Sequence, residues 1–351
     1  MFNLLEEIGQ VKTARKERES ISLARALLTN EPLDAEGTER FVHLAEKNKV
    51  LLRAAHLLRV PAETVAKAKD GVAEAFSLHN KMTAQFRKLG VSFVVLKSFD
   101  SLPDVGHDID LLVPSLSDMR KAQDFLITGL KARAVNLTHC DKLVGKFSCF
   151  LPDYSHDFEL YPTVSQMGEI HLDPQRVLKD GRLAIADGNE VLLTSDPDRV
   201  LIRVVHAMFR HNFLKLSDIL DLLNLERYCR PSEILDKIDE AGIGDAFLFY
   251  LDIIARFLKA CEVHDRRFNE LREATENRFG RSRLGFLQKD RLVLPYRVPI
   301  IALFLVFLLK AGREAARGRW KSCLTCAIAP PLKMLDYVVA ILRGGVKGGI
   351  W

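Results

Sequence analysis

The feature that most restricts the possible folds is a change in residue pattern at Gly90. Up to that point apolar residues recur at helical spacing. Two short runs rich in β-branched and apolar residues then follow, VSFVVLK at 91–97 and DIDLLVP at 108–114. Such runs are typical of strands, and the segment between them, SFDSLPDVGH, is rich in turn-forming residues. Helices followed by strands predict an α+β fold.

The pattern along the chain predicts a small mixed-sheet domain flanked by N-terminal and C-terminal helical regions. Within the sheet domain we expect an amphipathic helix over 115–134, capped by Ser115 or Ser117, and further strands over 142–152 and 156–164. The expected regions are a helical lead-in, an α/β core, a helical domain and an apolar, basic helical tail, at residues 1–90, 91–194, 195–290 and 291–351.

Composition excludes a disordered chain, and the charge distribution gives no specific signal for nucleic-acid binding. Hydrophobic residues make up 48% of the 351 positions and charged residues 28%, which is enough apolar surface for a core. The net charge of +5 lies entirely in residues 311–351, which hold seven basic and two acidic residues. The body of the chain is therefore neutral and has no basic excess.

The cysteines and the start of the sequence indicate a reducing, cytoplasmic location. No secretory signal opens the sequence, so the six cysteines are expected to be free thiols. Cys323-x-x-Cys326 is a lone pair that could hold a metal or serve redox chemistry. A packed or exposed helix turn is the more frequent explanation for such a pair.

Asp108-Ile109-Asp110 begins the second predicted strand. Side chains alternate across a strand, so the two carboxylates share one face while Ile109 packs behind them. Two neighbouring acids repel each other, and a divalent cation would remove that repulsion. Oxygen-rich sites suit Mg²⁺ or Mn²⁺ shared with substrate phosphates. Isolated pairs also occur at solvated strand ends, so the hypothesis depends on the neighbouring elements.

The neighbouring elements supply further candidate ligands. The predicted strand HDFELYP carries Asp157 and Glu159 on one face, and either can supply a third carboxylate. Gly106, in the preceding turn, can bring main-chain groups close to a phosphate. Lys97 or Ser98, at the end of the first strand, could contact a triphosphate.

This arrangement resembles the uncharacterised nucleotidyltransferase family of the polymerase-β-like superfamily. The superfamily motif is a glycine and then glycine or serine, a short spacer, and then aspartate, an apolar residue and aspartate or glutamate. Here Leu96-Lys97-Ser98 is followed by nine residues and then Asp108-Ile109-Asp110. The segments AEKNKVLLRAAHLL and VVHAMFRHNFLKLSDILDLL are similar to the family's flanking helices, so the resemblance spans about residues 40–225.

The resemblance implies a magnesium-dependent enzyme that moves a nucleoside monophosphate from a nucleoside triphosphate to an unknown acceptor and releases pyrophosphate. It implies that Asp108 and Asp110 are catalytic metal ligands. Asp157 matches the family's third acid, and Glu159, where the family has histidine, is a further candidate ligand. Lys97 replaces the motif glycine, which changes the phosphate-binding turn. A catalytically degenerate relative, binding nucleotide or acting as a membrane-peripheral partner, is the alternative.

His206 and His211 lie in the predicted helical region after the sheet. In a continuous helix, His206 would share a face with Arg210, Ser217 and Asp221. An imidazole near a carboxylate can act as a base or ligand, but helical phosphohydrolases use an adjacent His-Asp pair that this segment lacks. Two roles remain open, hydrogen bonding between helices and lining of the nucleotide or acceptor pocket, and the resemblance supports the second.

Residues 292–351 combine an apolar run with a basic end. PIIALFLVFLL, at 299–309, has eleven apolar residues, whereas a membrane-spanning helix needs about 20. Clustered cations and Trp320 follow. These features suit peripheral binding to an anionic membrane surface. The alternative is a buried core helix with a solvated basic tail.

Overall fold

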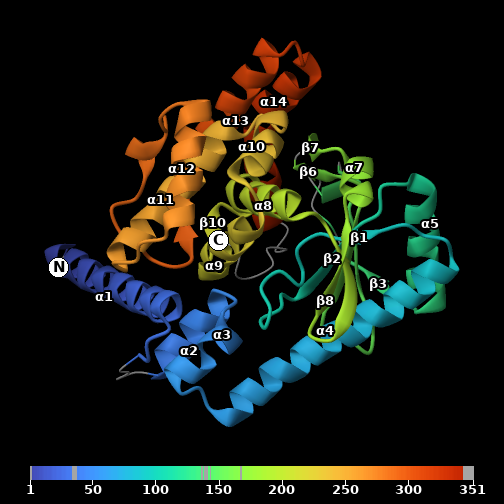
Figure 1. Cartoon of the computed structure of the whole chain (residues 1–351), viewed down its shortest axis with the longest axis horizontal. Coiled ribbons are helices and arrows are strands. Elements are labelled where there is room, and N and C mark those ends of the chain that lie inside the picture. The colour runs from blue at the N-terminus through green and yellow to red at the C-terminus, as the bar shows by residue number, and fades with distance from the viewer. Residues whose placement is uncertain are drawn as a thin grey trace.

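The computed structural model describes residues 2–33, 38–135, 137, 141–142, 144–166 and 168–342. It shows a central sheet with a long helix across one face and a large group of helices on the other side (Figure 1). The helices before the sheet are α1 (Phe2–Thr29), α2 (Thr38–Lys47), α3 (Leu51–Leu58) and α4 (Ala62–Lys88). Pro61 directly precedes α4. Gly90 follows it with a φ of +64°, a backbone conformation that favours glycine at a helix end.

The central sheet has seven strands in the order β3-β4-β5-β2-β1-β9-β8. These strands are β1 (Val94–Val95), β2 (Asp108–Leu112), β3 (Arg133–Ala134), β4 (Phe147–Phe150), β5 (Asp157–Tyr161), β8 (Arg182–Ala186) and β9 (Asn189–Leu193). β2 is antiparallel to β1 and parallel to β5, and β1 is parallel to β9. The α+β class with a mixed sheet is therefore confirmed.

Two small sheets and a series of helices complete the described elements. β6 (Val164–Gln166) pairs with β7 (Glu169–Leu172), and β10 (Phe213–Leu214) pairs with β11 (Tyr296–Arg297). The remaining helices are α5 (Leu116–Asp124), η1 (Phe125–Gly129), α7 (Pro174–Lys179), α8 (Asp196–Val205), η2 (His206–His211), α9 (Leu216–Leu225), η3 (Glu226–Tyr228), α10 (Pro231–Glu240), α11 (Gly244–Ala260), α12 (Arg266–Phe279), η4 (Gly285–Leu287), α13 (Ile300–Ala316) and α14 (Trp320–Leu342).

Several predicted boundaries are wrong. Ser115 caps α5, as expected, but the helix continues only as the π-helical turn η1 and does not reach residue 134. Residues 133–134 instead pair as β3 with β4, because an edge position in the sheet satisfies their backbone groups. The hairpins β6–β7 and β8–β9 were not predicted. The helix after Ser195 is not continuous either, since Asn212 adopts a left-handed conformation and β10 separates η2 from α9.

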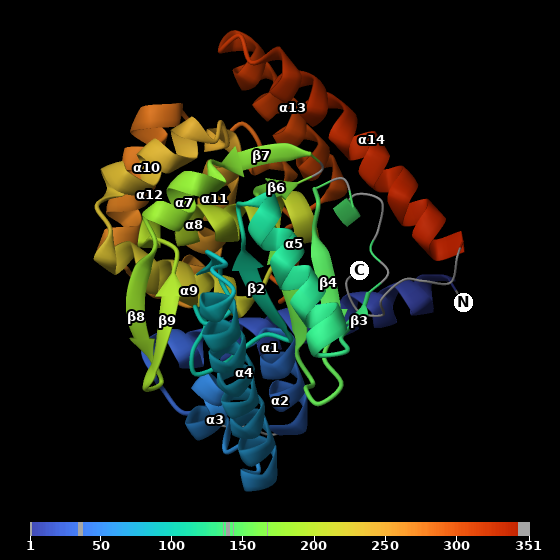
Figure 2. The same cartoon turned by 90° about the vertical axis from the view of Figure 1, so that its right-hand side faces the viewer.

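The two faces of the central sheet bury different cores. Ile109, Leu111 and Phe158 pack with α4 on one face, and Figure 2 shows α4 and α5 in front of the sheet. Leu112 and Tyr161 belong to the larger core, which is shared with α8, α9 and the later helices. Because neighbouring side chains alternate, Asp108 and Asp110 face the side of the C-terminal helices.

The C-terminal tail is packed against the molecule through α13. This helix buries Ala302, Leu303, Val306 and Phe307, so one side of the predicted apolar run is a core helix face. Cys323 and Cys326 lie one turn apart in α14, and burial raises the pKa of the Cys326 thiol to about 12. A packed helix turn therefore accounts for this pair. Within the described residues, no helix is long and apolar enough to cross a membrane.

A network of buried ion pairs joins the segment between β1 and β2 to the helices. Arg203 of α8 lies 3.2 Å from Asp100 and 2.7 Å from Asp221 of α9. Arg53 of α3 donates to Asp221 at 2.6 Å, and Asp104 accepts the backbone N–H groups at the start of α3. This network fixes the turn that leads into β2 relative to three helices.

Replacing one carboxylate of this network should destabilise the fold. Asp221→Asn keeps the shape but leaves Arg53 and Arg203 with less buried counter-charge, so we expect the free energy of unfolding to fall by about 3 kcal/mol or more. Denaturant titration measures the change. Glu270→Gln, which removes an exposed partner of Arg266, is the control and should change little. Equal effects of the two substitutions would contradict a supporting role for the network.

Candidate metal centre

The register between β2 and β5 brings four carboxylates onto one face of the sheet. Asp108 lies opposite Asp157, and Asp110 lies opposite Glu159. Adjacent strands are about 4.8 Å apart, so side chains opposite each other on one face are neighbours. The predicted candidates from the two strands therefore meet in one cluster.

Three of these acids form a group with the spacing of metal ligands. Asp108, Asp157 and Glu159 each offer a carboxylate oxygen, and these oxygens lie within 4.8 Å of one another. Oxygen ligands about 2.1 Å from one Mg²⁺ ion are separated by up to about 4.2 Å. Small side-chain rotations would bring this donor set to such a geometry, and hard carboxylate oxygens are the ligands that Mg²⁺ and Mn²⁺ prefer.

Asp110 has a different environment. Its Oδ2 accepts a hydrogen bond from Lys97 Nζ at 2.8 Å, and its backbone N–H donates to Ser98 Oγ at 2.7 Å. Burial alone would raise the pKa of Asp110, but the Lys97 ammonium holds it well below its usual range. Its second oxygen, Oδ1, is buried and has no hydrogen-bond partner among the described residues. A buried charged oxygen without a partner is costly, and a cation would satisfy it.

Glu159 is enclosed by cationic and hydroxyl groups. Lys146 Nζ lies 2.7 Å from its Oε1, and the Tyr161 hydroxyl donates to Oε2. Arg210 donates to the Tyr161 oxygen at 2.7 Å and lies over its ring. Burial, with the charge of Asp110, raises the pKa of Glu159, and Lys146 opposes that shift. Sequence reasoning missed Lys146, although its position two residues before Ser148 places it on the same strand face as Glu159.

The predicted nucleotide-binding residues come from several segments of the chain. Lys97 and Ser98 contact Asp110, as described above. His206 and His211 are the two ends of η2, and their rings meet at 4.1 Å between centroids. Burial, and then the charge of Lys97, holds the pKa of His206 well below its usual value, so its imidazole is neutral at pH 7. The helix break places Ser217 and Asp221 on a different helix from the histidines.

Gly106 has a neighbour that was not predicted. A Cβ atom at this position would lie 2.6 Å from the Lys49 ammonium nitrogen, which comes from the turn between α2 and α3. Because Gly106 has no side chain, the Lys49 ammonium group can lie beside the turn that precedes Asp108. The structure does not test the prediction that Gly106 brings main-chain groups close to a phosphate.

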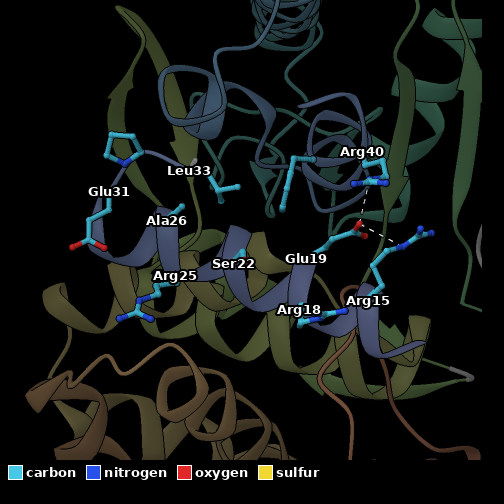
Figure 3. Close-up of a pocket in the computed structure, with 11 residues that line it drawn as sticks. Arg15, Arg18, Glu19, Ser22, Arg25, Ala26, Glu31, Leu33 and Arg40 are labelled. Carbon is cyan, nitrogen blue, oxygen red and sulfur yellow. Dashed lines mark ion pairs between the residues drawn. The ribbon is translucent and has the colours of Figure 1, made fainter. Parts of the chain in front are cut away.

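A separate cavity lies between α1, the start of the connection to α2, and α2 itself (Figure 3). Its volume is about 470 Å³, and four arginines line it, Arg15, Arg18, Arg25 and Arg40. Arg15 and Arg40 lie 3.7 Å and 3.3 Å from Glu19, so this carboxylate neutralises part of the positive charge of the cavity. None of the predicted site residues lines this cavity.

No family model, no curated protein and no solved structure matches the chain.

The two candidates for the third carboxylate can be separated by metal binding. Asp157 faces Asp108 across the strands, whereas Lys146 already neutralises Glu159. We therefore expect Asp157→Ala to weaken Mn²⁺ binding by about tenfold and Glu159→Ala to weaken it less. Mn²⁺ titration followed by electron paramagnetic resonance measures both. Asp153→Ala, an exposed acid in the preceding turn, is the control. A larger loss at Glu159 would reverse the assignment.

Proposed function

We propose that the protein is a metal-dependent nucleotidyltransferase that moves a nucleoside monophosphate from a nucleoside triphosphate to an acceptor. The observation that carries this proposal is the face of four in-register carboxylates, on which a buried oxygen of Asp110 has no hydrogen-bond partner among the described residues. The resemblance of residues 40–225 to the polymerase-β-like superfamily supports it. Asp108, Asp157 and Glu159 would hold a divalent ion, and Asp110 would turn Oδ1 toward it.

The reaction requires an oxygen nucleophile, a phosphorus centre and a proton acceptor. The acceptor oxygen would bond to the α-phosphorus while the bond from that phosphorus to the bridging oxygen of the β-phosphate breaks, so pyrophosphate leaves. Asp157 would take the proton of the acceptor hydroxyl. When bound, Mg²⁺ or Mn²⁺ supplies neutralisation of the charge that develops on the phosphoryl oxygens. The helices that cover this face of the sheet would limit access of water.

A catalytically degenerate protein of the same fold is the competing proposal. Lys97 and Lys146 already pair with Asp110 and Glu159, so the acids are partly neutralised without an ion. Such a protein would bind nucleotide and release no pyrophosphate. The two proposals therefore differ in a single measurable product.

Removing the charge of the D-x-D pair should abolish transfer. Asparagine keeps the shape of Asp108 or Asp110 but cannot hold a hard cation as strongly. With α-labelled nucleoside triphosphates and cell extract as the source of acceptor, we expect label transfer and pyrophosphate release by the wild type and neither by Asp108→Asn or Asp110→Asn. Circular dichroism checks the fold, and Asp153→Asn is the matched control. Activity within a few-fold of wild type in either variant would refute the assignment.

We also propose that α14 binds an anionic membrane surface without spanning it. Trp320, Leu324, Ile328, Leu332 and Leu335 lie about one turn apart, and Trp320 and Leu324 expose 65% and 61% of their surface. The opposite side of α14 is packed, with Cys326 and Ala329 buried. Exposed Lys321 follows Trp320, which gives the stripe a cationic, aromatic end suited to lipid headgroups. Arg319, which precedes Trp320, already pairs with Glu314 at 3.4 Å.

The structure changes which tail residues are expected to contact lipid. Arg313 and Arg317 pair with Asp245 and Asp239 on the helical region, so they attach the tail to the body. The apolar side of α13 that packs inward is likewise unavailable. Deleting residues 311–351 would remove buried side chains as well as the stripe, so point substitutions give the cleaner test.

Charge introduced into the stripe should release the protein from lipid. We expect wild-type protein to co-sediment with vesicles containing phosphatidylserine, less so at high salt, because basic residues contribute about 1 kcal/mol each near such a surface. Leu324→Glu combined with Ile328→Glu should abolish sedimentation. The matched control combines Leu116→Glu with Ile127→Glu, two exposed apolar residues of α5 and η1. Failure of the wild type to sediment at any salt concentration would refute membrane binding.

A further inference from the structure

Two lysines from distant parts of the chain are held side by side by a backbone clasp. Asn48, after α2, accepts hydrogen bonds from the first two N–H groups of α9: its side-chain Oδ1 accepts from Leu216 at 3.0 Å, and its carbonyl accepts from Ser217 at 3.2 Å. Lys49 follows Asn48, and Lys215 precedes Leu216. These two hydrogen bonds therefore hold the backbones of Lys49 and Lys215 close to each other, next to the start of α9.

The Lys49 side chain extends from this clasp to the candidate metal centre. Its ammonium nitrogen reaches the space beside Gly106, in the turn that enters β2 two residues before Asp108. Lys97, which donates to Asp110, approaches the same region from the end of β1. Lys215 lies close enough to Lys49, Lys97 and Asp108 for their charges to shift its pKa. Three lysines from three segments thus approach the acidic face where β2 begins.

Lys97 pairs with Asp110, but Lys49 and Lys215 are poorly compensated by the protein. Among the described residues, neither Lys49 nor Lys215 forms an ion pair with a carboxylate, and the Lys215 ammonium has the Phe213 ring at 5.3 Å. Burial, and then the charge of Lys97, lowers the pKa of Lys49. Burial, and then the charge of Lys49, lowers the pKa of Lys215 to about 7. Holding like charges together in a partly buried place costs free energy. Asp108 and Asp218 offset that cost only in part, since the pKa of both lysines stays lowered.

We infer that Lys49, Lys97 and Lys215 form a pocket for the polyphosphate chain of a nucleoside triphosphate. This inference rests on the proposed function and assigns the β- and γ-phosphates to the lysines, beside the acids that would meet the α-phosphate through metal. A polyphosphate carries several negative charges along a short chain, so it can contact all three ammonium groups at once. A ligand with a single carboxylate could not. The helical lead-in thereby contributes a binding residue to the sheet domain.

Binding of inorganic tripolyphosphate tests the pocket without any transfer reaction. The measurement is a calorimetric titration of the full chain in the presence of a chelator, so that no divalent metal takes part. Lys49→Met and Lys215→Met keep most of the side-chain volume and remove the charge, and each should weaken binding by about tenfold. Lys69→Met, on the exposed side of α4, is the control and should bind like the wild type.

A second variant keeps every charge and moves only one lysine. Gly106→Ala places a methyl group where the Lys49 nitrogen lies, and the flexible end of that side chain must shift. The φ of Gly106 is not in the left-handed region, so alanine brings no backbone strain. We expect an unchanged midpoint of thermal unfolding and weaker tripolyphosphate binding. This result separates a displaced lysine from a damaged fold.

The protonation of Lys215 supplies an independent readout. Its ammonium faces Lys49, Lys97, Asp218 and Asp108, and at pH 8 a group with a pKa of about 7 is mostly neutral. A bound polyanion stabilises the charged form, so binding at pH 8 should take up protons from the buffer. Titrations in buffers of different ionisation enthalpy measure this uptake, which should be smaller in Lys215→Met. Protonation of tripolyphosphate itself is common to both proteins and cancels in the comparison.

The outcomes distinguish this inference from the proposed function. Wild-type affinity for tripolyphosphate in Lys49→Met, Lys215→Met and Gly106→Ala would overturn the pocket, whatever the transfer assay shows. Lysine-dependent binding with no label transfer would support the pocket and overturn the enzymatic proposal. Lysine-dependent binding together with transfer that requires Asp108 would support both.

Discussion

Repulsion among four carboxylates on one sheet face is the constraint on which the rest of the site depends. The parallel register of β2 and β5 places these acids as neighbours, and such charges repel strongly where water is scarce. The fold offsets this repulsion with Lys97 beside Asp110, Lys146 beside Glu159, and Arg210 through Tyr161. These cations come from the end of β1, the start of β4 and η2. The sheet and the helices over it must therefore assemble together before the acids can be buried in charged form.

Much of the site could be predicted because it follows from strand periodicity. The D-x-D pair and the Asp157–Glu159 pair each alternate across a strand, so their shared faces are visible in the sequence, and the structure adds only the register between them. The β8–β9 hairpin could also have been found. Asp187 and Gly188 both have positive φ, and an Asp-Gly pair between strands is a common signal for such a turn. The short strand β3 could not, because its residues follow a helical pattern and only pairing with β4 decides their conformation.

Lys97 could be predicted from its place at the end of the first strand, but Lys49 and Lys215 could not be predicted in the same way. Lys49 lies almost sixty residues before Asp108, in a turn whose pattern suggests only the end of a helix. Its position depends on the hydrogen bonds of Asn48 to the start of α9, which are contacts between remote segments. The histidines show the same limit. Spacing placed His206 on a continuous helix with Asp221, but the left-handed Asn212 breaks that helix, and His206 instead meets His211.

Lys97 stands where the motif of the family that this chain resembles would have a glycine. In the resembling family, glycine would let the main chain approach a phosphate, and the backbone itself would provide the contact. Here the turn is anchored through Asp100, which pairs with Arg203 of α8, and through Asp104, which accepts from the backbone at the start of α3. A lysine side chain has a flexible stem, so its ammonium group can reach a ligand without movement of the backbone. Its point charge can bind either a carboxylate or a phosphate. Lys97 already donates to Asp110 and lies near enough to lower the pKa of Lys49 and His206. It thus lies between the acidic and the cationic groups, where its charge offsets the repulsion among the acids and opposes the protonation of Lys49.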